Sequence, residues 1–369
     1  MLFLSGCWDI DEADRMNYVI GMGIDYEDGE TVLHLQIPDL VSLGSPEVTP
    51  ENARAVTIAT ERGETLAAIA HNIYLSAQRK LYFGHNTLVI LTERALEEGL
   101  LKEAIDTLNR FPQTRYRVNF FATKSDLSEL LQVTTLFENS SILTRITDTE
   151  NTYELNSLIK NLSMRSLIIQ LTEPGYNGII PTIELNSTTW KGGDGKINAV
   201  ESTGVAVATP KELFGFIEGD DVKGIRWLQE SIRNNVMLEI DGKPAGEYIF
   251  INPRHKIKLE KSSGGKYVFH INVKTRGISR EVLEPVQYEE VVRSLSETIE
   301  EEIKTTYLKG LEMGTDIYRL SEHMYRYDLP LWKQLQEDGT VPLEEDSIQV
   351  KVDVDLNHTS VDKMAPTVQ

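Results

Sequence analysis

The chain has 369 residues, of which 40% are hydrophobic and 25% charged. This is the composition of an ordinary globular protein with two or three domains. The net charge of −20 argues against nucleic-acid binding, since such proteins carry basic patches, and against attachment to an anionic membrane by charge alone. One cysteine excludes an intramolecular disulfide, and no apolar run is long enough to span a bilayer.

The single cysteine, Cys7, follows a short apolar run and two small residues in the segment Leu4-Ser5-Gly6-Cys7. Bacterial signal peptidase reads this pattern when it releases an N-terminal cysteine that carries lipid. The apolar run is about four residues long, against roughly 7–15 in a complete signal peptide. We therefore predict lipidation of Cys7 in the natural full-length protein, whereas processing of this exact chain stays open.

The first half of the chain alternates predicted strands and helices. The continuously apolar strand 87–91, the helix 93–110 and the strand 115–122 form a βαβ unit, so the two strands are expected to be parallel neighbours. Alternating or helically spaced apolar residues predict the remaining elements of this half. These are a hairpin over 17–37, a strand and helix over 57–80, a helix that starts at Ser125-Asp126, and a mostly helical stretch over 137–166.

The second half begins after a polar, glycine-rich stretch at 188–195, which marks a domain boundary or a hairpin tip. A long helix is expected from Glu284-Pro285, with Gly310 and Gly314 bending or weakening it. Its inward stripe consists of Tyr288, Val291, Val292, Leu295, Ile299, Ile303 and Thr306. The other predicted elements are strands over 197–208, 213–217, 236–240, 247–251, 256–259, 267–274 and 347–356, and helices over 220–232 and 316–325.

These elements predict an α+β fold with mixed sheets packed against helices. We expect a signal-peptide remnant and lipid-attachment motif over 1–7, followed by three domains. They are an N-terminal α+β domain with the βαβ unit over 8–190, a strand-rich middle domain over 191–275, and a C-terminal α+β domain with the long helix over 276–369.

The motifs of common enzymes and metal sites are missing from the sequence. The seven histidines form no metal-binding pair, and no nucleophile elbow or phosphate loop occurs. Gly21-Met22-Gly23 lacks the third glycine and the helix of a dinucleotide site, so close approach of another backbone explains it better. We therefore predict no catalytic residue, metal or cofactor, and expect His85 to be a packed, hydrogen-bonded residue.

Arg110, Arg115 and Arg117 flank Tyr116 and could suggest a basic patch. Alternate positions on a half-exposed strand explain Arg115 and Arg117 more simply.

Several segments, in this order and spacing, resemble those of one family. They are Gly6-Cys7-Trp8-Asp9, Gly21-Met22-Gly23-Ile24-Asp25, residues 84–100, Gly204-Val205-Ala206-Val207-Ala208, Lys211-Glu212-Leu213-Phe214-Gly215, Gly314-Thr315-Asp316-Ile317-Tyr318 and Pro330-Leu331-Trp332. The chain resembles the C subunit of spore nutrient-germinant receptors, the Ger(x)C family of lipoproteins of endospore-forming bacteria.

The resemblance implies three α+β domains and an acylated cysteine at position 7. It implies a non-catalytic scaffold or coupling role beside two integral-membrane subunits, on the outer face of the inner spore membrane. Recognition of the germinant is usually placed on the membrane subunits, so direct germinant binding by this chain stays open.

Two other classes compete with this interpretation. An extracytoplasmic solute-binding lipoprotein would need two doubly wound lobes, which the strand-rich middle third and the helix-dominated last third disfavour. A surface hydrolase would need a nucleophile or metal constellation, and the sequence contains no motif of either kind.

Overall fold

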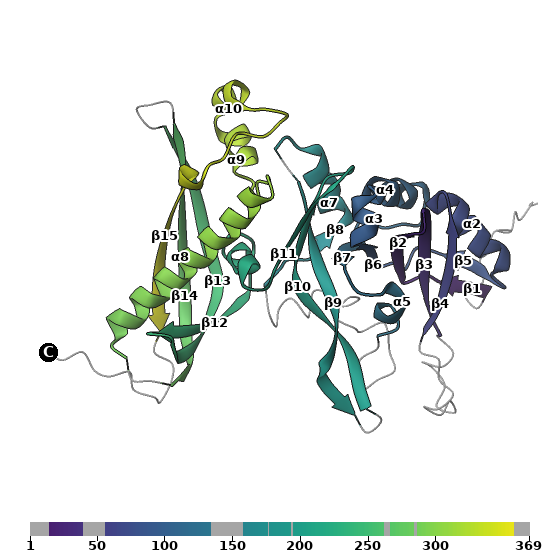
Figure 1. Cartoon of the computed structure of the whole chain (residues 1–369), viewed down its shortest axis with the longest axis horizontal. Coiled ribbons are helices and arrows are strands. Elements are labelled where there is room, and N and C mark those ends of the chain that lie inside the picture. Colours follow the sequence, from purple (N-terminus) through teal and green to yellow (C-terminus); the bar gives the residue numbers. More distant parts are fainter. Residues whose placement is uncertain are drawn as a thin grey trace, which may run out of the picture. The chain divides into compact units, whose positions relative to one another are not determined.

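The computed structural model describes residues 15–39, 56–133, 158–175, 177–192, 195–261, 266–283 and 286–357. The chain forms two compact units, one of residues 1–147 and 184–201, the other of residues 148–183 and 202–369. Sheets and helices occur in both units (Figure 1), which confirms the α+β class. The division into three domains stays a prediction, and Cys7 lies outside the described residues.

The first unit is built on a mixed sheet with the strand order β4-β3-β2-β6-β7-β9-β10. Residues 184–192 of β9 and 195–201 of β10 belong to this unit, and the rest of these two strands belongs to the second unit. The strands are β2 (Gly21–Glu27), β3 (Glu30–Pro38), β4 (Val56–Gly63), β6 (Leu88–Thr92), β7 (Asn119–Thr123), β9 (Gly178–Gly192) and β10 (Gly195–Ala208). The helices are α2 (Leu66–Ser76), α3 (Glu93–Glu97), α4 (Leu100–Arg110) and α5 (Leu127–Leu130), and β1 (Met16–Tyr18) pairs with β5 (Lys80–Tyr82).

The βαβ prediction is confirmed, since β6 and β7 pair in parallel and every residue of β6 is buried. The hairpin β2–β3 and the helix start capped by Asp126 are also confirmed. Two expected boundaries are wrong. The helix over 93–110 is divided into α3 and α4 at Gly99, which has a φ of 75°, and β7 begins only at Asn119.

Gly21 and Gly23 lie in β2, where neighbouring groups come close, as the sequence indicates. The neighbours are side chains rather than a second backbone. A Cβ at position 23 would lie 3.1 Å from a methyl carbon of Leu127, the first residue of α5, and of Leu131 at the end of this helix. The glycine therefore lets the short helix α5 pack directly against β2.

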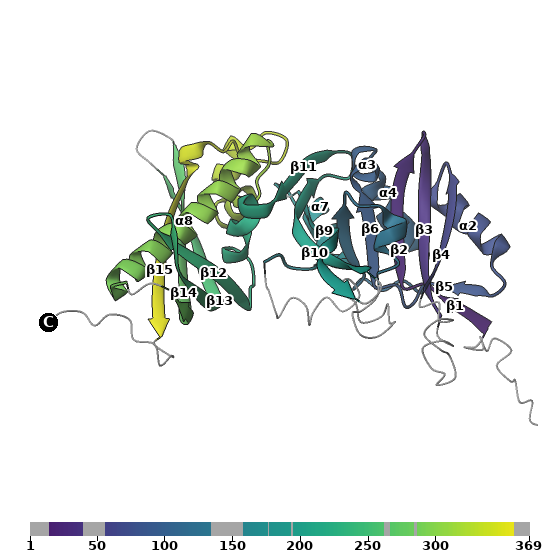
Figure 2. The ribbon, with the colours of Figure 1, turned by 60° about the horizontal axis from the view of Figure 1, so that its bottom comes forward.

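The second unit contains a four-stranded sheet with the order β12-β13-β14-β15. The pairs β12–β13 and β13–β14 are antiparallel, whereas β14 and β15 are parallel. The strands are β12 (Arg233–Ile240), β13 (Lys243–Lys261), β14 (Tyr267–Val282) and β15 (Ile348–Asn357). The helix α8 (Tyr288–Glu312) lies along one face of this sheet (Figures 1 and 2).

The core of the second unit lies between α8 and the sheet. Val291, Leu295, Ile299 and Ile303 recur at helical spacing on α8 and are buried, as the apolar stripe predicts. They pack in one cluster with inward residues of β14 and β15. The smaller elements are β8 (Leu162–Ser163), α7 (Met164–Thr172), β11 (Leu213–Glu218), the 3₁₀ helix η2 (Gly219–Trp227), α9 (Leu320–Tyr327), α10 (Leu329–Leu335) and the 3₁₀ turn η3 (Glu345–Ser347).

Four expectations for this unit are corrected. Residues 219–227 form a 3₁₀ helix that ends at Trp227, not a helix to Ile232. The expected strands 247–251 and 256–259 are one strand, β13, with a register shift near Asn252. The helix α8 begins only at Tyr288, and it continues through Gly310 and ends before Gly314. The helix α9 starts at Leu320, not at Asp316. Of the stretch 137–166, residues 137–157 lie outside the described residues.

Gly224 is the point where η2 comes closest to α8. A Cβ at this position would lie 2.3 Å from the carbonyl oxygen of Glu302 and 2.7 Å from the Cα of Ile303.

Because these are backbone atoms of α8, we expect Gly224→Ala to lower the free energy of unfolding by roughly 1–3 kcal/mol. Urea denaturation followed by circular dichroism measures the change. Lys223→Ala, in the same turn but outside this contact, is the control and should have little effect; equal losses would contradict the explanation.

Candidate functional site

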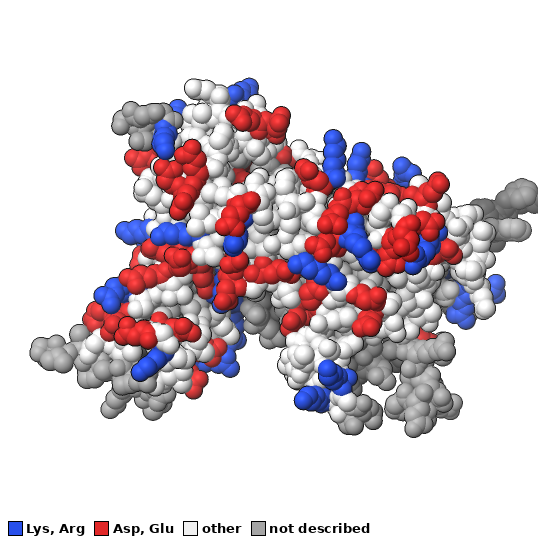
Figure 3. Space-filling model, in the orientation of Figure 1, with Lys and Arg blue, Asp and Glu red and all other residues white. Residues whose placement is uncertain are grey.

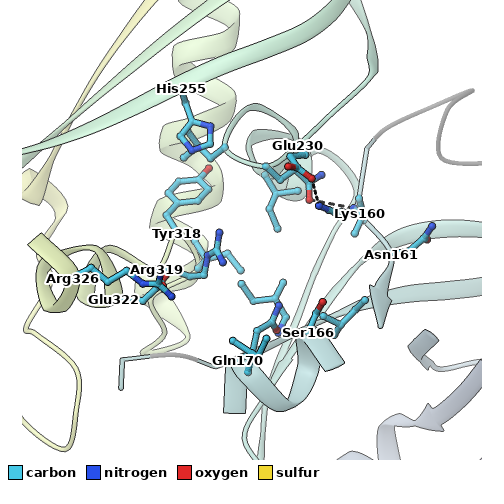
Figure 4. Close-up of a pocket in the computed structure, with 18 residues that line it drawn as sticks. Lys160, Asn161, Ser166, Gln170, Glu230, His255, Tyr318, Arg319, Glu322 and Arg326 are labelled. Atoms are coloured by element: carbon cyan, nitrogen blue, oxygen red, sulfur yellow. Dashed lines mark hydrogen bonds and ion pairs between the residues drawn. The ribbon is translucent and has the colours of Figure 1, made fainter. Parts of the chain in front are cut away.

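The second unit contains a pocket of about 570 Å³ (Figure 4). Its walls come from four parts of this unit: the segment 159–170 with Ile179, the end of η2 with residues 228–230, His255 of β13, and residues 317–326 in and before α9. Side chains that are far apart in the sequence, such as Lys160, Gln170 and Arg319, therefore border one space.

The helix α7 provides the wall that carries Ser166 and Gln170. Ser163 caps this helix, and its Oγ accepts a hydrogen bond of 3.2 Å from the backbone N–H of Ser166. Met164 and Leu167 are buried, which leaves the Ser166 and Gln170 side of the helix toward the pocket. The Oε1 of Gln170 accepts a 2.9 Å hydrogen bond from the backbone N–H of Ile179 and so fixes the start of β9 against α7.

The opposite wall depends on the tight loop between α8 and α9. Asp316 is buried in this loop, and its Oδ2 accepts a 2.6 Å hydrogen bond from the backbone N–H of Ser321. Burial raises the pKa of the Asp316 carboxyl. The hydroxyl of Tyr318 donates to the carbonyl oxygen of Ile303, 2.9 Å away, so the loop is attached to α8.

Arg319 follows directly in this loop and has a φ of 58°, in the left-handed region. This conformation is uncommon for a residue with a side chain, and it brings the guanidinium group to the pocket. Burial lowers the pKa of Arg319, whereas the nearby Glu322 raises it and Arg326 lowers it. The Arg319 guanidinium stays charged at neutral pH, because the pKa of arginine lies far above 7.

Two ion pairs border the same pocket. The Nζ of Lys160 contacts the Oε2 of Glu230, and the hydrogen bond from Lys160 lowers the pKa of Glu230. Arg326 contacts Glu322, which lies one turn earlier in α9. It also contacts Glu173, at the end of α7, at a distance of 2.9 Å. The arrangement suits a small polar or charged molecule, since both signs of charge lie around one cavity.

A largely buried ionic group lies beside the pocket, and we call Glu302, Arg226 and Trp227 the Glu302 cluster. Arg226 donates to both carboxylate oxygens of Glu302, at 2.6 and 3.2 Å. The indole N–H of Trp227 donates to the same carboxylate at 2.6 Å, and Arg226 also donates to the carbonyl oxygen of Asn235 at 2.9 Å. The cluster thus connects η2, α8 and β12.

The first unit has a related arrangement at Asp25, the last residue of the segment 21–25. Its buried carboxylate accepts hydrogen bonds of 2.5 Å from the hydroxyl of Thr92 and from Nη2 of Arg94. The hydrogen bond to Asp25 is the largest cause that raises the pKa of Arg94. Asp25 therefore joins β2 to the junction of β6 and α3, which gives a structural role to two of the segments that the sequence singled out.

The remaining residues that the sequence singled out lie elsewhere. His85 is exposed on the turn before β6, so the expected packed histidine is wrong. Its ring makes edge contacts with Tyr18, at a centroid distance of 5.0 Å. Arg115 and Arg117 are exposed on the turn before β7, not on the strand.

The part of the chain that the structure describes holds no group of three His, Cys, Asp or Glu side chains placed to bind a metal ion. In the same residues, no helix is long and apolar enough to cross a membrane.

The fold and the site define an α+β protein that presents ordered sheet and helix surfaces and a polar pocket. Two family models match the chain: the spore germination protein N-terminal domain over residues 9–185, and the spore germination B3/GerAC-like C-terminal domain over residues 203–360. The chain belongs to this family, the C subunits of spore germination receptors.

Individual relatives agree with this assignment. Spore germination protein KC of Bacillus subtilis (strain 168) is 24% identical over 387 residues, which cover 98% of this chain and 94% of that protein. Spore germination protein B3 of the same organism is 22% identical over 335 residues, which cover 89% and 84% of the two chains. The crystal structure of the GerBC protein covers 92% of this chain and 97% of its own, with a TM-score of 0.52 and 18% identity, and has the same fold.

The Glu302 cluster yields a stability prediction. We expect Glu302→Gln to lower the free energy of unfolding by roughly 3–5 kcal/mol, because it leaves the Arg226 guanidinium buried without its counter-charge. The double variant Glu302→Gln/Arg226→Met should recover a large part of this loss, since it removes the unpaired charge as well. Guanidinium denaturation of the two single variants and the double variant measures the coupling.

Glu312→Gln is the matched control for this experiment. Glu312 lies on the same helix and pairs with Lys309, but the Glu312 side chain is exposed and that of Lys309 is partly exposed. Solvent screens such a pair, so we expect no measurable change. Additive losses in the double variant would contradict the assigned coupling.

Proposed function

We propose that this protein is a lipid-anchored, non-catalytic subunit of a spore nutrient-germinant receptor. The observation that carries the proposal is the match of both family models, which together span most of the chain. In this role the protein lies on the outer face of the inner spore membrane and binds two integral-membrane subunits. It acts as a scaffold that couples their response to the nutrient to the start of germination.

The anchor in this proposal is Cys7. Its support is the segment Leu4-Ser5-Gly6-Cys7, which has the small residues that a lipoprotein signal peptidase requires before the modified cysteine. A diacylated cysteine supplies two acyl chains, and two chains give stable attachment where one gives only marginal attachment.

The scaffold role is supported by the way the second unit is held together. The Glu302 cluster joins three elements, and the loop around Asp316 is attached to α8 by the Tyr318 hydroxyl. A unit with such internal connections presents its surfaces in one fixed geometry, which is what a partner subunit needs in order to bind with little ordering cost.

Substitution of Cys7 tests the anchor. In the natural full-length gene, we expect Cys7→Ala to release the protein from the spore membrane fraction and to slow nutrient germination strongly, because the acyl chains have no attachment point. Fractionation, fatty-acid labelling and germination assays measure the three effects.

Ser5→Ala is the matched control, since alanine is also a small residue at this position and lipidation should continue. Normal membrane retention and normal germination of the Cys7→Ala variant would disprove the anchoring part of the proposal.

The pocket supports a second candidate function, an extracytoplasmic solute-binding lipoprotein. Its volume of about 570 Å³ lies in the range of small-molecule sites. A thermal-shift screen with amino acids and sugars separates the candidates. Under the scaffold proposal no nutrient stabilises the isolated chain, whereas stabilisation that Arg319→Ala abolishes would assign ligand recognition to this pocket.

A further inference from the structure

The sheet β12-β13-β14-β15 is covered by α8 on one face only. Phe269, Ile271 and Val273 of β14 are buried in the core with α8. The residues between them point to the other face, because side chains alternate along a strand. Exposed side chains of the neighbouring strands β13, β14 and β15 lie side by side on this second face, and no described element covers them.

This second face carries a concentration of cations, and we call it the basic sheet face. The strand register places its residues in rows across the sheet: Arg254 beside Lys274 and Asp353, and Lys256 beside Asn272 and Lys351. Lys258 and Arg276 lie on the same face in the neighbouring rows. Six Lys and Arg side chains thus share one face: Arg254, Lys256, Lys258, Lys274, Arg276 and Lys351.

Within the described part of the chain, four of the six cations on this face are left without a carboxylate partner after the ion pairs of the face are counted. Lys274 pairs with Asp353 at 3.2 Å, and Arg276 pairs with Asp355 at 3.3 Å. Among the described residues, no carboxylate lies within ion-pair distance of the other four cations. These four are Arg254, Lys256, Lys258 and Lys351, and all are exposed.

The opposite side of the same unit is acidic. The helix α8 exposes Glu289, Glu297, Glu301 and Glu312 against two exposed cations, Arg293 and Lys304, and Figure 3 shows mostly red side chains over this helix. The unit therefore separates its charges, with carboxylates over α8 and unpaired cations on the uncovered side of the sheet. Such a separation is unexpected in a chain whose net charge is −20.

We propose that the basic sheet face binds the surface of an anionic phospholipid bilayer. A helix about 10 Å thick lies between the face and the α8 glutamates, and the Debye length at physiological ionic strength is about 8 Å. The glutamates are therefore screened from a membrane that the face touches, and the local cations determine the interaction.

A fluid lipid surface fits this face better than an acidic protein does. Three of the four unpaired cations are lysines, which act as point charges toward phosphate groups and need no fixed partner geometry. Stable protein partners are held by buried aromatic or arginine anchors in well-packed pockets, whereas the row of Lys256, Asn272 and Lys351 has no aromatic side chain. The membrane setting rests on the proposed function, but binding to vesicles does not.

Vesicle sedimentation of the unlipidated chain tests the proposal separately from Cys7 and from germination. Vesicles with about one-third phosphatidylglycerol should bind the protein at low salt, pure phosphatidylcholine vesicles should not, and added salt should release it. The variant Lys256→Glu/Lys258→Glu/Lys351→Glu should bind on the order of tenfold more weakly or not at all. The milder Lys→Gln triple variant should give an intermediate loss.

The control variant changes the net charge equally but leaves the face intact. Lys211→Glu/Lys304→Glu/Lys333→Glu reverses three exposed lysines of the same unit that lie outside the face, and it should bind almost as the unchanged protein does. Circular dichroism and sedimentation velocity confirm folding and oligomeric state. Equal weakening of both triple variants, no binding to anionic vesicles at low salt, or self-association that needs the three face lysines would overturn the proposal.

Discussion

The structure of the second unit depends on one buried ionic contact, between Glu302 of α8 and Arg226 of η2. Taking both groups out of water costs solvation energy, and the two-point geometry with the added hydrogen bonds of Trp227 and Asn235 offsets that cost. A hydrophobic replacement could be as stable. We infer that the cluster serves to select one packing of η2 against α8, which an apolar contact alone would leave less specific.

This packing determines both surfaces on which the functional proposals rest. The pocket is bordered by the end of η2 and by the loop that Tyr318 attaches to α8. The basic sheet face is uncovered because α8 occupies only the other side of the sheet. The helix α8 therefore positions the polar pocket. Its glutamates make one side of the unit acidic, and the basic sheet face lies on the other side.

Much of the fold was predictable where the signal is local in the sequence. The buried strand β6, its parallel partner β7 and the stripe on α8 follow from periodicity, and the structure confirms them. The break at Gly99 and the 3₁₀ form of residues 219–227 were not predictable from periodicity. Gly99 sits in an otherwise helical pattern, and Gly224 allows a close contact with α8 that becomes visible only when both elements are placed.

The candidate site was less accessible to prediction than the fold. Asp316 and Tyr318 lie in a segment that the family resemblance had marked, but Lys160 and Arg319 meet at the pocket from segments that are far apart in the chain. Glu302 follows Ile299 by one helical turn, at the border of the apolar stripe, which is a weak signal for a buried carboxylate. Burial of such a charge can be recognised only when its partner Arg226 is known.

By itself, the sequence determined the α+β class, the βαβ unit, the long amphipathic helix and the family, because these depend on local periodicity and on ordered segments along the chain. The tertiary structure decided which charges meet. Net charge is a sum over all residues and contains no position, so the value of −20 gave no sign of a face that gathers cations. The pairing of β13, β14 and β15 brings Lys256, Lys258 and Lys351 onto one uncovered face, because strand register, which is set by contacts between distant segments, determines the side of the sheet on which each residue lies.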